Sequence, residues 1–114
     1  MTKDKVVLVP FPFDDLSSAK VRPAVCLTDP IGPHRHVILA FISSRMLADL
    51  LETDVVLDAG QPDFGDTGLR ISSTLRLHRL MTTATPLIRR DLGTLPPRIQ
   101  TEVAGKLRKL FALQ

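Results

Sequence analysis

The sequence predicts a mainly β protein, in which a small and mostly antiparallel β-barrel carries one helix at its C-terminal end. Five apolar segments rich in β-branched residues follow one another, separated by short stretches rich in Pro, Gly and Asp. The clearest apolar pattern with helical spacing lies near the end of the chain. A chain of 114 residues is long enough for one core, so we expect a single domain over residues 1–114.

Five strands are expected from the apolar segments. Lys5–Phe11 is apolar nearly throughout and contains a proline, and Arg22–Thr28 is a second apolar run. His36–Ser44 is rich in large aliphatic residues, which is typical of a buried strand. Thr53–Asp58 is expected to form a short fourth strand. Ser72–Thr83 alternates polar and apolar residues, as a half-exposed strand does.

Two helices are expected as well. Residues 46–52 are expected to form a short helix between the third and fourth strands. The second helix is expected over residues 96–114, where prolines occupy the first turn and are tolerated. Its apolar residues fall on one stripe, made of Ile99, Val103, Leu107, Leu110 and Phe111.

The composition favours an intracellular protein without a membrane anchor. The longest apolar stretches fall short of the ~18 residues that a membrane helix needs, and the first residues lack the layout of a signal peptide. Cys26 is the only cysteine, so we expect no disulfide within the chain and a small buried hydrophobic side chain at this position. We therefore expect a cytoplasmic protein that does not bind membranes.

The charged residues are unevenly distributed along the chain. Up to Gly68 there are six basic and ten acidic residues, and from Leu69 onward there are nine basic and two acidic ones. Ten of the basic residues are arginines, whose planar guanidinium suits phosphate. A basic half of a small domain favours a polyanionic partner over a merely solvated surface.

The sequence contains no motif for a metal or a nucleotide cofactor. It has neither H-E-x-x-H nor C-x-x-C, and no glycine-rich phosphate loop follows a strand. His34 and His36 flank Arg35 in a turn and lack convincing ligand spacing. The remaining reactive side chains are Arg, Ser and one His on strands. These groups can act on a phosphodiester when the substrate supplies its own nucleophile, as RNA does with its 2′-hydroxyl.

Four blocks of the sequence, in order, resemble the PemK/MazF-type toxins of bacterial toxin–antitoxin systems. In the first block, VVLVPFPFDDLSSAKVRPAVCLT, a strand ends at F-P-F, a polar loop follows, and K-x-R-P-A opens the second strand. The other blocks are ILAFISS, TGLRISSTLRLHRLMTT and LIRRDLGTLPP. The blocks are spread over residues 6–97, so the resemblance extends over nearly the whole chain.

The resemblance implies an SH3-like β-barrel of about five to seven strands with a C-terminal helix, as in the MazF and CcdB toxins. It implies a toxin of a type II system that acts as a sequence-selective endoribonuclease on single-stranded mRNA, without metal or other cofactor. It also implies a homodimer and an antitoxin of the MazE/PemI type that occupies the RNA groove. The apolar stripe of the terminal helix is available either for the dimer or for packing on its own barrel.

By resemblance, Arg22 and Ser43 are the catalytic residues. A guanidinium at Arg22 can hold the scissile phosphate with two donors and stabilise the charge of the transition state, and it can also protonate the leaving 5′-oxygen. The alternative is that Arg22 pairs with Asp14 or Asp15 and fixes the loop. Ser43 replaces a Thr of the family and keeps its hydroxyl, which either binds phosphate or only satisfies the end of the strand.

Five further residues are expected to contact RNA. The hydroxyl of Ser44 can bind phosphate together with that of Ser43. Three further residues lie in the loop that flanks the RNA channel in the family, namely Ser17, Ser18 and Lys20. His78 stands where many members carry an acidic residue. A neutral His there is either a base for the 2′-hydroxyl, a reader of a base edge, or a structural residue of the strand.

Two other functions fit the same fold. A gyrase-poisoning toxin shares the barrel and acts by protein binding, for which it depends on its terminal helix. An inactive relative would retain only antitoxin binding. The R-P-A and I-S-S segments favour the ribonuclease.

Overall fold

The computed structural model describes residues 2–11, 20–45 and 47–113. Six strands, two short 3-10 helices and one α-helix follow one another in this part of the chain. Their bounds are β1 Lys5–Phe11, β2 Lys20–Cys26, β3 His36–Ser43, β4 Asp54–Leu57, η1 Phe64–Thr67, β5 Ser73–Ala84, η2 Thr85–Leu87, β6 Arg90–Thr94 and α1 Pro97–Leu110. The prediction of a mainly β fold with a C-terminal helix is confirmed.

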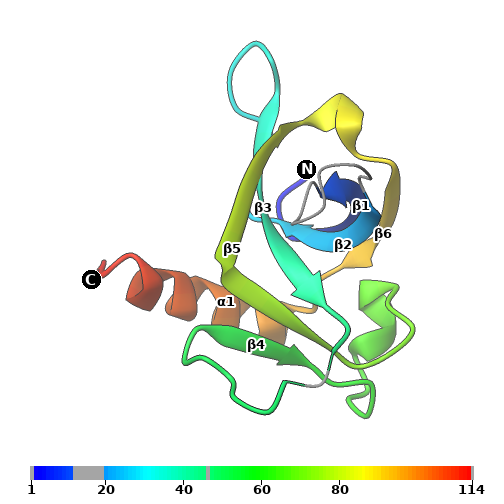
Figure 1. The fold of residues 1–114 in the computed structure, drawn as a ribbon, viewed down its shortest axis with the longest axis vertical. Helices are drawn as coiled ribbons and strands as arrows, with labels where there is room; N and C mark the ends of the chain where they lie inside the picture. Colours follow the sequence, from blue (N-terminus) through cyan, green and yellow to red (C-terminus); the bar gives the residue numbers. More distant parts are fainter. Residues whose placement is uncertain (1, 12–19, 46, 114) are drawn as a thin grey trace.

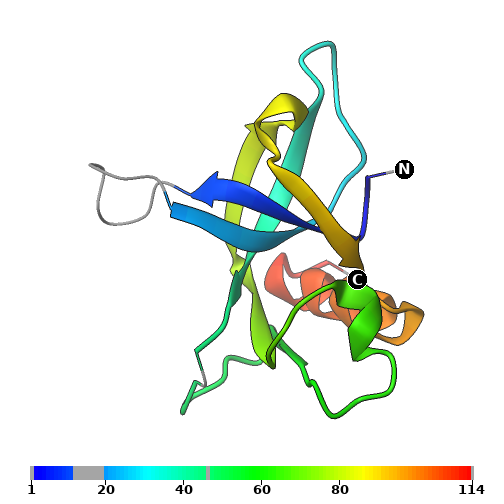
Figure 2. The same cartoon turned by 90° about the vertical axis from the view of Figure 1, so that its right-hand side faces the viewer.

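The strands form one antiparallel sheet with the order β4-β5-β3-β2-β1-β6. The sheet curls into a half-barrel, in which β1 and β2 run across β3 and β5 (Figures 1 and 2). The helix α1 lies against β4 and β5. The two edge strands, β4 and β6, are the shortest strands of the sheet, which limits the length of open edge.

The curled sheet has an apolar cluster on each of its faces. The first cluster joins the sheet to α1 and contains Val6, Val25, Ala40, Ile42, Val55, Leu57, Leu75, Leu77, Leu95, Ile99 and Val103. The second contains Val7, Val9, Phe11, Ala24, Cys26, Val37 and Leu39. Successive residues of β1, β2 and β3 alternate between the two clusters. This explains why these strands are apolar along most of their length.

Two expectations about the elements were wrong or incomplete. Residues 47–52 are not helical. Instead, the Asp54 carboxylate accepts a hydrogen bond from the Leu51 backbone N–H at 2.9 Å, and the Asp54 N–H donates to the Leu51 carbonyl at 3.0 Å, which forms a turn before β4. A helix of seven residues has too few internal hydrogen bonds to compete with such a turn. The strand β6 was not expected, because its sequence RDLGT is mostly polar; in the described sheet this edge strand pairs only with β1.

The C-terminal helix ends earlier than the sequence predicts. It stops at Leu110, and Phe111 is 54% exposed. Ala112 has a positive φ of 55°, and the N–H groups of Ala112 and Leu113 donate to the carbonyls of Lys109 and Arg108 at 3.1 and 2.7 Å. These two bonds close the helix in a Schellman motif, so the apolar stripe is shorter than expected. No helix in the described residues is long and apolar enough to cross a membrane.

Candidate functional site

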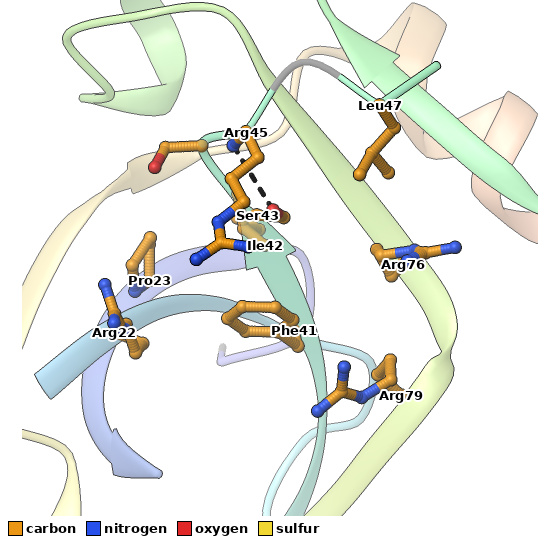
Figure 3. A pocket seen from close by; sticks show the side chains of 10 residues that line it. Arg22, Pro23, Phe41, Ile42, Ser43, Arg45, Leu47, Arg76 and Arg79 are labelled. Atoms are coloured by element: carbon orange, nitrogen blue, oxygen red, sulfur yellow. Dashed lines mark hydrogen bonds between the residues drawn. The ribbon is translucent and has the colours of Figure 1, made fainter. Parts of the chain in front are cut away.

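A pocket of about 360 Å³ opens where the start of β2, the end of β3 and the middle of β5 meet (Figure 3). Its described lining combines basic, hydroxyl and apolar side chains and includes no acidic one. The lining residues are Arg22, Pro23, Phe41, Ile42, Ser43, Ser44, Arg45, Leu47, Arg76 and Arg79. A concave surface with four arginines concentrates positive potential and attracts anions.

The pairing of the strands brings these residues together. Arg22 and Ala24 are two residues apart on β2 and therefore point to the same face of the sheet. Ala24 pairs with Phe41 of β3, and Phe41 pairs with Arg76 of β5. Ser43 follows two residues after Phe41, at the end of β3. Three neighbouring strands thus present one row of side chains to the pocket.

A bulge in β5 brings a second arginine of that strand to the same face. Phe41 pairs with Arg76, and the preceding residue Ala40 pairs with Leu80, so residues 77–79 of β5 lie between two consecutive pairs. In a regular strand, residues three positions apart point to opposite faces. The register shift at these three residues breaks the alternation of β5, and Arg79 lines the pocket together with Arg76.

The four arginines have different surroundings. The Nε and Nη2 groups of Arg76 donate to the two oxygens of the fully buried Asp54 carboxylate at 3.2 and 3.3 Å. The guanidinium carbon of Arg79 lies 5.3 Å from the centre of the Phe41 ring. Arg22 and Arg45 form no side-chain hydrogen bond or ion pair with any described residue. Figure 3 shows Arg45 reaching toward the space around Phe41 and Arg22 at the edge of this space beside Pro23, whereas Arg76 points away from it.

Ser43 presents its hydroxyl at the end of β3. The residue is 8% exposed, and its Oγ accepts a hydrogen bond from the backbone N–H of Arg45 at 3.3 Å. This bond uses a lone pair and leaves the hydroxyl proton for donation to a bound anion. Ser44 is exposed beside it and supplies a second hydroxyl. The pocket therefore offers charged and neutral donors at close quarters, which suits a phosphate group.

The family model described as PemK-like, MazF-like toxin of type II toxin–antitoxin system matches residues 3–111. The chain belongs to this family. The resemblance expected from the four sequence blocks is thereby confirmed. No curated protein sequence matches the chain significantly.

Solved structures of toxins share the fold of this family member. The Mycobacterium tuberculosis toxin MazF-mt6 superposes with a TM-score of 0.73 at 21% identity, covering 96% of this chain and 98% of that one. An endoribonuclease in complex with its cognate antitoxin from Mycobacterial species gives 0.72 at 11% identity, with 100% and 97% covered. The MazE–MazF complex (Form-II) from Deinococcus radiodurans gives 0.68 at 19% identity, again with 100% and 97% covered.

The structure gathers some of the expected site residues and separates others. Arg22, Ser43 and Ser44 line one pocket. Lys20 is exposed at the first residue of β2, outside the pocket lining. His78 is exposed in the bulge of β5 and does not line the pocket either, so its role in RNA binding stays a prediction. The expected RNA contacts Ser17 and Ser18, and the alternative Arg22 partners Asp14 and Asp15, lie outside the described residues.

Sequence reasoning singled out three of the ten described lining residues and missed the others, among them Phe41, Arg45, Arg76 and Arg79. Phe41 looked like an ordinary core residue of the third strand. The alternation of β5 placed Arg76 and His78 on one face, and nothing in the sequence marks the bulge that replaces His78 by Arg79 there. Arg45 directly follows I-S-S, and this proximity to Ser43 was a signal that could have identified it.

Other reactive groups of the described residues lie away from this chemistry. Cys26 is fully buried, and burial raises the pKa of its thiol to about 11, so the thiol stays protonated at neutral pH. The described residues contain no group of three His, Cys, Asp or Glu side chains that is placed to hold a metal ion.

Proposed function

We propose that this family member is a metal-independent, sequence-selective endoribonuclease that acts on single-stranded mRNA as the toxin of a type II system. The observation that carries the proposal is the pocket itself. Arg22 and Arg45 face it without a described carboxylate partner, and the hydroxyls of Ser43 and Ser44 lie beside them. Such a set of donors matches the oxygens of a phosphodiester and the extra charge of its transition state.

The proposed reaction uses the 2′-hydroxyl of the RNA as the nucleophile. Its oxygen bonds to the adjacent phosphorus while the bond from phosphorus to the 5′-oxygen of the next nucleotide breaks. The proton of the 2′-hydroxyl passes to a base, and the leaving 5′-oxygen takes up a proton. The products are a 2′,3′-cyclic phosphate and a 5′-hydroxyl end, and no water is consumed in this step.

Arg22 and Ser43 are the proposed catalytic residues. The guanidinium of Arg22 contacts two non-bridging oxygens, whose negative charge grows in the transition state. The hydroxyl of Ser43 donates to one of these oxygens and fixes the orientation of the phosphate. Arg45 is proposed as a further phosphate ligand, because it lines the same pocket from the segment after β3. Lys20, Ser44 and the loop residues Ser17 and Ser18 are proposed to hold the neighbouring backbone of the RNA.

The proposed partners are single-stranded RNA, a second copy of the chain and an acidic antitoxin that competes with RNA. Two of the similar structures are toxins bound to their antitoxins, which supports the last of these. The homodimer is proposed from the family alone. Most of the helix stripe packs on the chain's own core, because Ile99 and Val103 are buried in it and Leu107 and Leu110 pack against it. Phe111, the last residue of the stripe, is exposed. A toxin that acts on mRNA is proposed to work in the cytoplasm.

Incubation of the purified protein with a mixed-sequence RNA in EDTA tests the proposal. We expect cleavage at a small set of sequences, with 2′,3′-cyclic phosphate and 5′-hydroxyl ends. A substrate with a 2′-deoxy group at the scissile nucleotide is expected to stay intact, whereas 2′-deoxy substitution elsewhere has little effect. Products with 5′-phosphate ends, or cleavage of the 2′-deoxy substrate, would overturn the mechanism. An RNA left intact under all conditions would favour a toxin that acts by protein binding.

A further inference from the structure

Phe41 is an aromatic ring at the centre of an otherwise basic pocket. The chain has no Trp or Tyr and only five Phe residues. Aromatic rings are therefore rare in this chain, and one of them lies beside the proposed phosphate site. Phe41 is half-buried and occupies the row between Arg22 on β2 and the arginines of β5. Figure 3 shows the ring between Arg22 and the two arginines of β5.

The orientation of the ring is fixed from the core side. Phe11 is 5% exposed, and its ring contacts the Phe41 ring edge to face, with centroids 5.7 Å apart and an angle of 63° between the planes. This geometry is the favourable one for two aromatic rings. Because Phe11 belongs to the apolar cluster, it anchors Phe41 to the rigid part of the sheet.

The guanidinium of Arg79 lies over the ring of Phe41. The distance of 5.3 Å from the guanidinium carbon to the ring centre is within the range of a cation–π contact. Arg79 as a residue is exposed, while Phe41 beneath it is half-buried. Arg79 reaches this position only because of the β5 bulge. The contact between the planar guanidinium and the ring therefore depends on the irregular pairing of β3 with β5.

Planar groups of this kind bind nucleobases. Aromatic rings and guanidinium planes both stack on bases, and stacking tolerates every base because each has a π-face. A lysine would supply the same charge as Arg79 but no plane. An Arg79→Lys substitution can therefore separate the effect of the positive charge from that of the planar guanidinium.

We propose that Phe41 and Arg79 form a stacking site for one nucleobase next to the phosphate held by Arg22 and Arg45. This inference rests on the proposed function for the identity of the ligand as RNA. The pocket then has two parts. The phosphate part is formed by β2 and the segment after β3, and the base part is formed by β3 and β5. Base stacking is worth about 1–3 kcal/mol, which corresponds to an about 5- to 150-fold gain in affinity.

The test compares AMP and UMP with ribose 5-phosphate as probes, by NMR titration of the isotopically labelled full chain. We expect AMP to bind at least about 5-fold more tightly than ribose 5-phosphate, with a ring-current shift at the Arg79 Nε–H. Arg79→Lys is expected to keep the affinity for ribose 5-phosphate within about twofold and to reduce the advantage of AMP, because it keeps the charge and removes one of the two planar groups. The matched control is Arg90→Lys on β6, an exposed position outside the pocket, which should change neither affinity.

Equal affinities of AMP, UMP and ribose 5-phosphate for the wild-type chain would overturn the stacking site. An Arg79→Lys chain that keeps the full AMP advantage would do the same. These titrations need no cleavage, so their outcome is separate from that of the EDTA assay. A wild-type chain that prefers AMP but leaves every RNA intact would overturn the proposed function and retain the stacking site. A wild-type chain that cleaves RNA but binds AMP and ribose 5-phosphate equally would do the reverse.

Discussion

The basic side chains of the pocket and those of helix α1 differ in what they contact. On α1, Arg98 donates to Asp63 at 2.9 and 3.2 Å, and Lys106 and Lys109 pair with Glu102 and Glu52 at 2.8 and 3.0 Å. In the pocket, four arginines share a described lining without acidic residues, and Arg76 among them pairs with the Asp54 carboxylate behind it.

This difference shows that a charge count along the sequence does not predict a charged surface. The C-terminal part from Leu69 is strongly basic, yet Asp54, Asp63 and Glu52 fold from the acidic part onto Arg76, Arg98 and Lys109. Much of the predicted asymmetry is thus neutralised between the two parts. The basic patch that remains at the site comes from both halves, because Arg22 and Arg45 belong to the acidic one. We infer that Arg22 and Arg45 are the pocket arginines available to a phosphate ligand, whereas the helix pairs and the Arg76–Asp54 pair contribute to the fold.

The largest expected effect is the loss of activity in Arg22→Ala. Removal of a donor to a developing oxyanion costs on the order of 100- to 1,000-fold in rate. Because Arg22 has no described partner, its removal leaves no buried charge behind, and the thermal unfolding midpoint should stay near that of the wild type. Cleavage rates and circular dichroism measure the two quantities. A folded Arg22→Ala chain with wild-type activity would contradict the proposal that Arg22 acts on the substrate.

The next effect is on stability, and it comes from Asp54. Asp54→Ala leaves the partly buried Arg76 without its counter-charge and removes the acceptor of the Leu51 N–H, so the free energy of unfolding should fall by about 3 kcal/mol. Glu52→Ala is the control, because the pair between Glu52 and Lys109 is exposed and should contribute less than about 1 kcal/mol. Urea unfolding of both variants gives the numbers. Equal losses would mean that burial does not distinguish the two pairs.

A smaller effect on the rate is expected for Ser43. Ser43→Ala removes one neutral donor to the phosphate, and the neighbouring hydroxyl of Ser44 partly replaces it, so the rate should fall on the order of 10-fold. Ser43→Thr keeps the hydroxyl and should stay within a few-fold of the wild type. Single-turnover cleavage separates the chemical step from binding. A Thr variant as slow as the Ala variant would show that the hydroxyl is not the group that matters.

The features of the fold and site that could be predicted from the sequence are those that depend on residues close together in the chain. The five apolar strands and the terminal helix follow from local patterns, and Arg22 and Ser43 lie at strand ends that those patterns define. The turn at 47–52 depends on Asp54, which competes with the helical pattern of the segment. The bulge that moves Arg79 into the pocket is a property of the pairing between β3 and β5, and a single strand carries no sign of it. The pairing of acidic and basic halves likewise appears only once the strands have been placed.

The smallest expected effect is a pH dependence in the helix pair. The hydrogen bond from Arg98 lowers the pKa of the Asp63 carboxyl, so folding favours its charged form. The stabilisation is complete above the carboxyl's ordinary pKa and is lost as the pH falls through the lowered value. Arg98→Ala should therefore lower the unfolding midpoint slightly at pH 7, and the difference from the wild type should vanish once the pH lies below the lowered pKa of Asp63. A difference that persists at low pH would indicate a packing role for Arg98 instead.

The most direct test of the division between pocket and helix is the salt dependence of RNA binding. Each phosphate contact on a single strand contributes about 0.7 to the slope of log K against log salt concentration. With a 2′-deoxy-blocked RNA, Arg45→Ala should lower the magnitude of this slope by about 0.7, while Lys109→Ala on α1 should leave it unchanged. An unchanged slope for Arg45→Ala together with a lowered slope for Lys109→Ala would place the RNA on the helix face and contradict the assignment of the pocket.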